Sequence, residues 1–507
     1  MGPRCASQAS ASLEPQLDAA RSLRANASTY YMDNHDDPTV FSRVNAASAD
    51  AGSFKDASGR VYEIDGEILR SVAPCAAGDY DFVAASGIRE TLADRGWLVG
   101  STEVDKARLG AAGALAHRVV RHPRLAFVSY PYEWSFPLLK AAALLHLDIQ
   151  IEILERDIAL SDASAYNIQF DGIQPVLIDV LSLRRYREKE FWTGHRQFCE
   201  QFLNPLLLRA LFGITHNAWF RGNLEGVDTT DLARLLPWHG RGSWRLLAHV
   251  VLPARFQRRA LKDGSDLEKL KRQRLPKGSY RNMLVQLRCW IAALHPRDTG
   301  RTVWGDYQEG HSYASDEESA KRRFVAEFCE AVKPALLWDL GCNTGEYAET
   351  ALAAGAGRVI GFDFDHKALE RAYARAIRGS LPFLPLFQDG ANPSPAQGWN
   401  TVERKGLSDR ARADALLALA FEHHLAIGRN VPLEGVVAWL VSLAPRGVIE
   451  FVHKGDPTVQ RMLALREDIF HEYTEEHFLN ALHQRARIVR REVFSGTGRT
   501  LYWFDRS

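Results

Sequence analysis

The chain has 507 residues, of which 46% are hydrophobic, 10% aromatic and 25% charged, close to an average soluble globular protein. Its 63 Lys and Arg residues balance its 62 Asp and Glu residues, so the whole-chain charge carries no information about an acidic partner. The composition excludes a disordered, a collagen-like and a disulfide-scaffold protein, and the length predicts two or three domains.

The six cysteines are scattered along the chain. They form neither a Cys-x-x-Cys pair nor a spacing with histidines that is typical of a zinc site, so no metal centre is predicted. Free cysteines fit a reducing cytosol. The sequence contains no run of about 18 apolar residues that could span a membrane and no apolar secretion signal at its N-terminus. We therefore expect a cytoplasmic protein.

Residues 1–40 are rich in Ala, Ser and Asn, which predicts a loosely ordered leader. Residues 41–185 mix short strand-like runs with helical stretches over Phe82–Arg95 and Pro137–Leu154, a pattern typical of an α+β domain. The strand-like runs are residues 60–65, 67–72, 97–101, 125–130, 167–170 and 175–180.

Three polar residues of this domain have a distinctive spacing. Asp162 is followed by Asn167 and then by Asp179, which ends a strand-like run. The order resembles the catalytic and metal-binding loops of the protein-kinase-like fold, in which one Asp orients a hydroxyl while Asn and a second Asp hold magnesium. However, no Gly-rich loop, strand lysine or His-Arg pair accompanies it. Two interpretations stay open: a remotely kinase-like domain, or a structural domain whose Asp and Asn cap turns.

Residues 186–299 form the next region. Up to about residue 240 the apolar residues recur at helical spacing, which predicts packed helices. Residues 241–288 then contain 13 Lys and Arg but only three acids. Breaks at Pro253 and Pro276 predict short helices in a connector. Such a basic face is usually solvated, and binding to nucleic acid or another anionic surface is the less favoured interpretation.

From about residue 300 to 507 the periodicity alternates between helix and strand, which predicts a doubly wound, mostly parallel sheet with a terminal hairpin. Its strongest motif is an apolar run that ends at Asp339. A turn containing Gly341, Asn343 and Gly345 follows and opens a helix. Glycines allow a ligand to approach the backbone closely. A dinucleotide pyrophosphate would be repelled by the carboxylate, whereas S-adenosylmethionine has no phosphate and carries an ammonium group.

Two further strands are predicted to end in acids. Asp363, which precedes Phe364 in the expected cofactor site, can accept hydrogen bonds from both ribose hydroxyls, and Asp389 can accept one from the adenine amino group. His424 follows the fourth strand. It is our candidate general base, although it could equally bond the backbone and pack its loop. All these residues lie at the carboxyl ends of strands, where open parallel sheets bind ligands.

On these residues, the region from about 304 to 507 resembles class I S-adenosylmethionine-dependent methyltransferases. Residues 339–345 stand where that superfamily has its Gly-rich first motif, Asp363 matches its ribose-binding acid, and Asp389 the acid beside adenine. Asn343 departs from the commonest pattern, which has a glycine there. The resemblance implies S-adenosylmethionine as the cofactor.

After about residue 40 the chain more narrowly resembles the large proteins grouped with the rhizobial host-specificity nodulation protein. That resemblance is carried by several short stretches, and it implies a link to nodulation or cell-surface glycan chemistry. The stretches include His311-Ser-Tyr313, residues 338–345, Asn392-Pro-Ser-Pro395, His423-His424-Leu-Ala-Ile and residues 449–456.

We therefore expect an α/β methyltransferase domain at 300–507, joined through the region 186–299 to an N-terminal domain at 41–185 that presents or selects the acceptor. The acceptor is an unidentified small molecule or glycan, no metal is required and nucleic acid is not expected. The rival interpretation is a non-catalytic S-adenosylmethionine-binding scaffold or regulatory protein with a pseudokinase-like N-terminal half.

Overall fold

The computed structural model describes residues 49–237, 243–255, 275–297, 315–464 and 466–507. The predicted leader, the central part of the basic connector and the His311-Ser-Tyr313 stretch lie outside these residues. Residues Ala47–Ser507 form one compact unit. The predicted domain limits at 185 and 300 therefore stay predictions.

The first described elements form an antiparallel sheet with the order β1-β2-β4-β3. A tight turn at Asp65 and Gly66, both with positive φ, joins the first two strands, as two-residue hairpins require. The predicted helix over 82–95 is wrong in its start and continuity, because α2 begins at Ala77 and Gly87 (φ 67°) separates it from α3. The elements are β1 (Gly59–Ile64), β2 (Glu67–Val72), α2 (Ala77–Ala85), α3 (Ile88–Asp94), β3 (Thr102–Val104), α4 (Ala111–Ala114) and β4 (Arg118–His122).

Two predicted strands are absent from the described structure. The stretch 97–101 makes one isolated bridge, Leu98 with Leu177, and 125–130 lies outside every ladder. The backbone of 125–130 is held instead by a side chain, because Gln169 accepts from Ser129 N at 2.8 Å and donates to Ser129 O at 2.8 Å. An apolar run can be buried in this way without pairing as a strand.

The long helix α5 (Phe136–Leu154) is buried along most of its length and confirms the helix predicted over 137–154. Short antiparallel pairs follow it, and the pair β6–β7 turns at Gly172 and Ile173, between the paired residues Asp171 and Gln174. The strands are β5 (Ile158–Leu160), β6 (Ile168–Asp171), β7 (Gln174–Leu177) and β8 (Leu183–Arg185), with β5 paired to β8.

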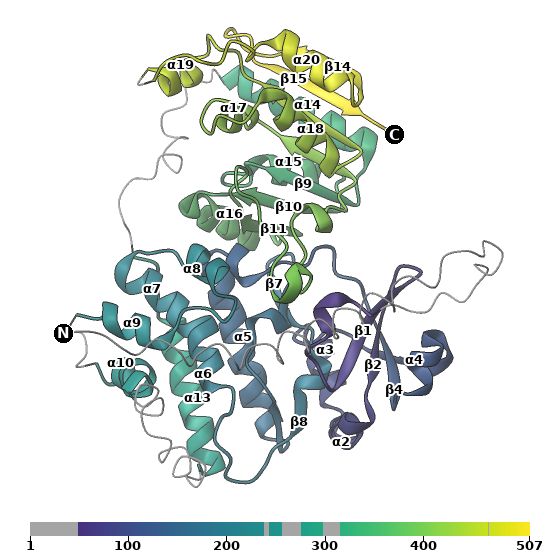
Figure 1. Cartoon of the computed structure of the whole chain (residues 1–507), viewed down its shortest axis with the longest axis vertical. Coiled ribbons are helices and arrows are strands. Elements are labelled where there is room, and N and C mark those ends of the chain that lie inside the picture. The colour runs from purple at the N-terminus through teal and green to yellow at the C-terminus, as the bar shows by residue number, and fades with distance from the viewer. Residues whose placement is uncertain (1–48, 238–242, 256–274, 298–314, 465) are drawn as a thin grey trace, which may run out of the picture. The chain divides into compact units, whose positions relative to one another are not determined.

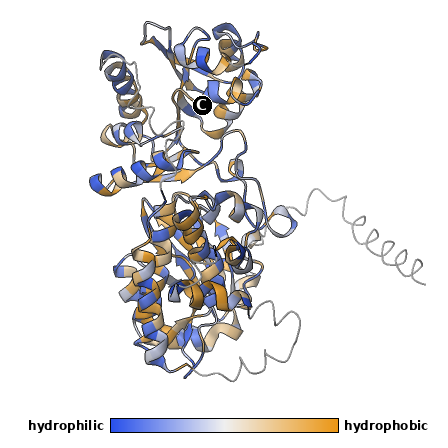
Figure 2. Ribbon diagram, turned by 90° about the vertical axis from the view of Figure 1, so that its left-hand side faces the viewer, coloured by the Kyte–Doolittle hydropathy of each residue, from blue (hydrophilic) through white to orange (hydrophobic). Residues whose placement is uncertain are grey.

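The next region is helical, as predicted for 186–240, and hydrophobic residues gather along its packed helices (Figure 2). Two of its segments, η7 and η9, are π-helical. None of the described helices is long and apolar enough to cross a membrane. The elements are α6 (His195–Phe198), η7 (Cys199–Leu203), α7 (Asn204–Phe212), α8 (Asn217–Gly222), α9 (Thr229–Leu235), α10 (Trp244–Leu246), η9 (Leu247–Val251) and α13 (Lys277–Ala292).

The C-terminal part contains a sheet with the order β11-β10-β9-β12-β13-β15-β14 (Figure 1). The first five strands in this order are parallel, and the final hairpin β14–β15 is antiparallel. This confirms the predicted doubly wound sheet with a terminal hairpin. The strands are β9 (Leu336–Leu340), β10 (Arg358–Asp363), β11 (Phe383–Phe387), β12 (Ala415–Ala418), β13 (Arg446–Phe451), β14 (Arg487–Val493) and β15 (Thr500–Asp505).

Helices cover both faces of this sheet. Leu337 packs in one core with side chains of α14, α15 and α16, whereas Trp338 and Leu340 pack in the other with side chains of α17, α18 and α20. The alternation along β9 is the two-residue period of a strand buried on both faces. The helices are α14 (Ser315–Val332), α15 (Glu346–Ala353), α16 (His366–Gly379), α17 (Glu422–Ala426), α18 (Leu433–Leu443), α19 (Pro457–Leu463) and α20 (Glu475–His483).

Candidate functional site

The Gly-rich turn connects β9 to α15. Gly341, Asn343 and Gly345 all have positive φ, at 74°, 47° and 82°. A Cβ added to Gly345 would lie 2.5 Å from the Phe383 ring, so this position needs glycine. Asn is one of the few other residues that enter the left-handed region at modest cost, which explains how Asn343 can replace the more common glycine. Backbone N–H groups of Gly341 and Cys342 donate to Phe362 O and tie the turn to β10.

Two carboxyl groups lie at this turn, and neither forms an ion pair with a described residue. Asp339 is only 2% exposed, and its Oδ2 has no hydrogen-bond partner among the described residues. Burial and the neighbouring Asp363 raise the pKa of Asp339 to about 7, against a lowering by Lys321. Burial raises the pKa of Asp363 to about 6, although that carboxylate accepts from the backbone N–H of Asn343 at 2.9 Å and of Asp365 at 2.8 Å. A cationic or hydroxylated ligand would stabilise both charges.

Asp389 lies two residues beyond the end of β11 and not at the strand end itself. Its carboxylate accepts from the backbone of Ala391 at 3.0 Å and from Arg429 at 3.2 Å. The preceding Gln388 is buried, and its Nε2 donor has no hydrogen-bond partner among the described residues. Phe364, beside Asp363, is 45% exposed. The convergence of Asp339, Asp363 and Asp389 on one cleft stays a prediction.

His424 lies in α17, directly after the fourth parallel strand. Burial, His423 and Arg499 lower the pKa of His424 well below 6.5, so the imidazole is neutral at neutral pH. It can accept a proton, but it is a weaker base than an ordinary histidine. The ring of His423 lies 4.1 Å from that of His424. Nearby, the buried Glu422 accepts from the hydroxyl of Tyr473 at 2.7 Å.

A buried charge network that the sequence did not reveal follows β13. The carboxylate of Glu450 lies 2.5 Å from Lys321 Nζ and 3.2 Å from Arg499, and Arg499 also bonds Asp456 at 2.7 Å. Burial raises the pKa of Glu450, but Lys321 and Arg499 together hold it below its ordinary value. Lys321 also lies 4.8 Å from the Tyr347 ring centre. The only indication of this network in the sequence is an acid, Glu450, within an apolar strand, because Lys321 lies in a helix more than a hundred residues earlier.

In the N-terminal part, Asp162, Asn167 and Asp179 do meet. Asn167 Nδ2 lies 3.1 Å from Asp162 Oδ1 and 3.4 Å from Asp179 Oδ2. The structure adds Arg70 of β2, which pairs with Asp179 at 2.7 Å and with Asp56 at 2.6 Å. Burial and Asp179 raise the pKa of Asp162 to about 7. Asp179 therefore already has an internal cation, and the kinase-like interpretation stays a prediction.

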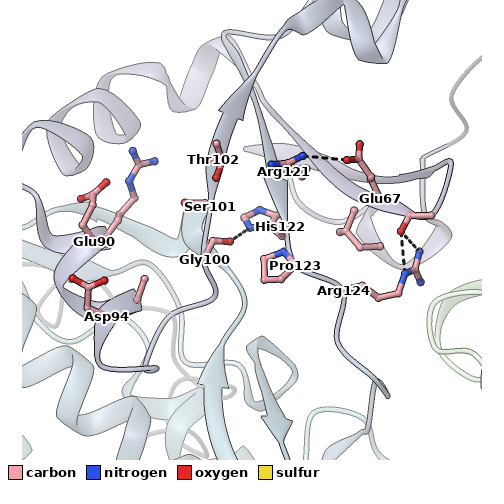
Figure 3. Close-up of a pocket in the computed structure, with 14 residues that line it drawn as sticks. Glu67, Glu90, Asp94, Gly100, Ser101, Thr102, Arg121, His122, Pro123 and Arg124 are labelled. Atoms are coloured by element: carbon pink, nitrogen blue, oxygen red, sulfur yellow. Dashed lines mark hydrogen bonds and ion pairs between the residues drawn. The ribbon is translucent and has the colours of Figure 1, made fainter. Parts of the chain in front are cut away.

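A pocket of about 570 Å³ lies between α3 and the strands β3 and β4, and Figure 3 shows its lining. Its walls carry charges of both signs, including Arg89, Glu90 and Arg121. His122 bonds Gly100 O at 3.0 Å across it. None of its lining residues belongs to the Gly-rich turn, so it is separate from the expected cofactor site.

Comparison with known proteins identifies one relative of most of the chain and one of a smaller part of it. The nodulation protein NoeA of Rhizobium meliloti (strain 1021) is 48% identical over 458 residues, which cover 90% of this chain and 96% of that protein. The ribosomal protein L11 methyltransferase of Dechloromonas aromatica (strain RCB) is 34% identical over 115 residues, 23% of this chain and 35% of that enzyme. No family model matches the chain.

Solved structures also align with part of the chain. The N-methyltransferase NodS from Bradyrhizobium japonicum WM9, in complex with S-adenosyl-L-homocysteine, has a TM-score of 0.29 and 15% identity, and covers 40% of this chain and 99% of its own. The magnesium protoporphyrin IX methyltransferase ChlM from Synechocystis PCC 6803 has a TM-score of 0.29 and 18% identity, and covers 40% of this chain and 93% of its own.

Proposed function

The chain belongs to the family of the nodulation protein NoeA, and on this premise we propose that it transfers a methyl group from S-adenosylmethionine to a small-molecule or glycan acceptor. The observation that carries the proposal is the buried Asp339, whose Oδ2 has no hydrogen-bond partner within the described part of the chain and which lies at a Gly-rich turn between β9 and α15. That turn stands at the carboxyl end of a central parallel strand, where open α/β sheets bind ligands.

The residues around the turn fit S-adenosylmethionine, which when bound supplies a methyl group activated by its positive sulfur. Asp339 and the backbone of residues 341–345 would hold the amino-acid end, because an ammonium group compensates a buried carboxylate. Asp363 would accept from the ribose hydroxyls. Asp389 and the Nε2 donor of Gln388, which has no partner among the residues that the structure describes, would bind the adenine edge, since one accepts and the other donates hydrogen bonds.

The acceptor side of the proposal involves α17 and the charge network after β13. As the acceptor's lone pair bonds to the methyl carbon and the carbon–sulfur bond breaks, the acceptor oxygen or nitrogen must lose a proton. His424, neutral at neutral pH because of its lowered pKa, would take that proton. Glu450 is already paired with Lys321 and Arg499, so its role would be to position these cations and not to act as a base. The N-terminal domain would present or select the acceptor.

Titration calorimetry with S-adenosylmethionine tests the binding step. Asp363→Ala removes contacts to two hydroxyls, and a hydrogen bond to a charged group contributes about 1.5–3 kcal/mol, so affinity should fall at least tenfold. The matched control is Glu434→Ala, which removes an exposed acid of α18 that pairs with Arg485. This variant should bind S-adenosylmethionine with wild-type affinity. Unchanged affinity in a folded Asp363→Ala protein would remove that residue from the site.

Transfer is tested separately by incubating the protein with methyl-labelled donor and fractionated cell extract. Label that enters a small-molecule or glycan fraction, and is lost with His424→Gln, supports the proposed catalysis. Binding of the donor without transfer of label to any fraction would instead favour the rival interpretation, a non-catalytic scaffold that binds S-adenosylmethionine.

A further inference from the structure

Two histidines and a cysteine meet in the helical region, outside the methyltransferase sheet. His195 begins α6, Cys199 begins the π-helical η7, and His249 lies in the π-helical η9. His195 Nε2 lies 3.1 Å from His249 Nδ1, and Cys199 Sγ lies 3.6 Å from His195 Nε2. All three ligand atoms lie within 4.8 Å of one another.

These separations suit one metal ion. Zinc binds imidazole nitrogen at about 2.0–2.1 Å and thiolate sulfur at about 2.3 Å in tetrahedral geometry. Tetrahedral angles with those bond lengths place two nitrogens roughly 3.3–3.4 Å apart and nitrogen and sulfur roughly 3.6 Å apart. The observed 3.6 Å matches the second value, and the observed 3.1 Å is only slightly below the first.

The local backbone brings the ligands together. His195 and Cys199 are four residues apart on one continuous helix, so their side chains lie on the same face. Both Cys199 and His249 belong to π-helical turns, which are rare and occur frequently at functional sites. The rings of Trp192 and Trp290 flank the two histidines at 5.6 Å and 6.0 Å, which makes part of the surroundings apolar.

The donor types also suit zinc. Imidazole nitrogen and thiolate sulfur are both common zinc ligands, and a bound metal deprotonates a coordinating thiol.

We propose that His195, Cys199 and His249 bind one zinc ion, which fastens η9 to the α6–η7 helix. The Cys199 S–H bond breaks as the zinc–sulfur bond forms, and the proton goes to solvent. Among the described residues no further His, Cys, Asp or Glu joins the cluster, so water would occupy the fourth position. The proposal departs from the prediction from sequence, which expects no metal centre; no short spacing indicates the cluster, because His249 lies about fifty residues beyond Cys199.

The test uses the full-length protein without a histidine tag, stripped with a chelator and then dialysed against zinc. Elemental analysis should give one zinc per chain, and Cys199→Ser and His249→Gln should each lose that equivalent. Two matched variants should keep it: Cys289→Ser, at an exposed free cysteine, and His117→Gln, at a surface histidine paired with Asp81. Wild-type protein that retains no more zinc than Cys199→Ser would overturn the proposal.

Cobalt substitution keeps the proposal testable if a variant fails to fold, because it is measured on the wild type. Cobalt(II) should produce a thiolate-to-cobalt charge-transfer band and the intense visible bands of a tetrahedral site, and one equivalent of zinc should abolish both. A cobalt spectrum without the thiolate band would overturn the assignment of Cys199. Selective retention of copper(I) with no zinc binding would overturn the assignment of zinc.

Discussion

Lowering the pH from 7 to 6 should weaken the binding of S-adenosylhomocysteine about tenfold. The reason lies in the two carboxyl groups of the Gly-rich turn, whose pKa values are raised to about 7 for Asp339 and about 6 for Asp363. The ligand's ammonium and hydroxyl groups favour the ionised carboxylates. Binding below these pKa values therefore requires each group to release a proton first.

The magnitude follows from the ionised fractions. Between pH 7 and pH 6, a group with a pKa of about 7 falls from roughly half to a tenth ionised, which costs roughly fivefold in affinity. A group with a pKa of about 6 falls from nearly fully to half ionised, which costs roughly twofold more. The ligand's own amino group, with an ordinary pKa of about 7.7–8.0, stays protonated over this interval. The pH dependence of the affinity therefore reports the ionisation of the protein's carboxyl groups and not that of the ligand.

Titration calorimetry in buffers of equal ionic strength measures the effect, and proton release can be checked by repeating it in buffers of different ionisation enthalpy. Asp339→Asn should bind more weakly at pH 7 and lose most of the pH dependence. Without ligand it should be more stable than wild type above pH 7. The folded-state pKa of Asp339 lies above its unfolded-state pKa, so the wild type loses stability as the pH rises from the unfolded-state value through the folded-state value. An affinity in the wild type that does not change between pH 6 and pH 7 would refute this reasoning.

Three further expectations concern other parts of the chain. Arg410→Ala should destabilise the protein by about 3–5 kcal/mol in chemical unfolding, because it leaves Glu133, 1% exposed and 2.5 Å from the guanidinium, as a buried uncompensated charge; a loss under about 1 kcal/mol would contradict it. ATP with magnesium should shift the melting temperature little, because Arg70 already neutralises Asp179, whereas S-adenosylmethionine should raise it clearly by linkage. A strong ATP effect that Asp179→Ala removes would instead establish a nucleotide site there. Gln388→Ala should weaken S-adenosylhomocysteine binding by about 0.5–1.5 kcal/mol and leave its pH dependence unchanged. Calorimetry that finds wild-type affinity in this variant would contradict the expectation.

The sequence predicts this fold best where side-chain pattern and turn chemistry agree. The paired strands on either side of Gly172 and the parallel strands that end near Asp339 and Asp363 fall close to the predicted runs, because each has both a periodic apolar run and a turn residue. Residues 125–130 have the apolar run but pair with no strand in the described structure. A buried glutamine side chain, Gln169, satisfies Ser129 there, and nothing local in the sequence indicates that replacement.

Site residues follow a similar division. The acids of the Gly-rich turn could be predicted, because they are adjacent to a strand end and to glycines that need positive φ. Lys321, Arg70 and His249 could not, since each reaches its partner only through tertiary packing and none stands in a spacing that marks its role. Asp389 falls between these cases: it follows the expected strand, but its pairing with Arg429 depends on the loop after α17.

Four buried acids of this chain differ in how their charge is compensated. Glu133, Glu450 and Asp456 each have an arginine within about 3.2 Å, and a buried charge compensated in this way gains little from a cationic ligand. Asp339 is as buried as these, yet its Oδ2 accepts no hydrogen bond among the described residues. Such a group costs stability in the free protein. A fold that keeps it at a Gly-rich turn is stabilised most by a ligand that supplies the missing positive charge, which is the property of S-adenosylmethionine that the proposed function uses.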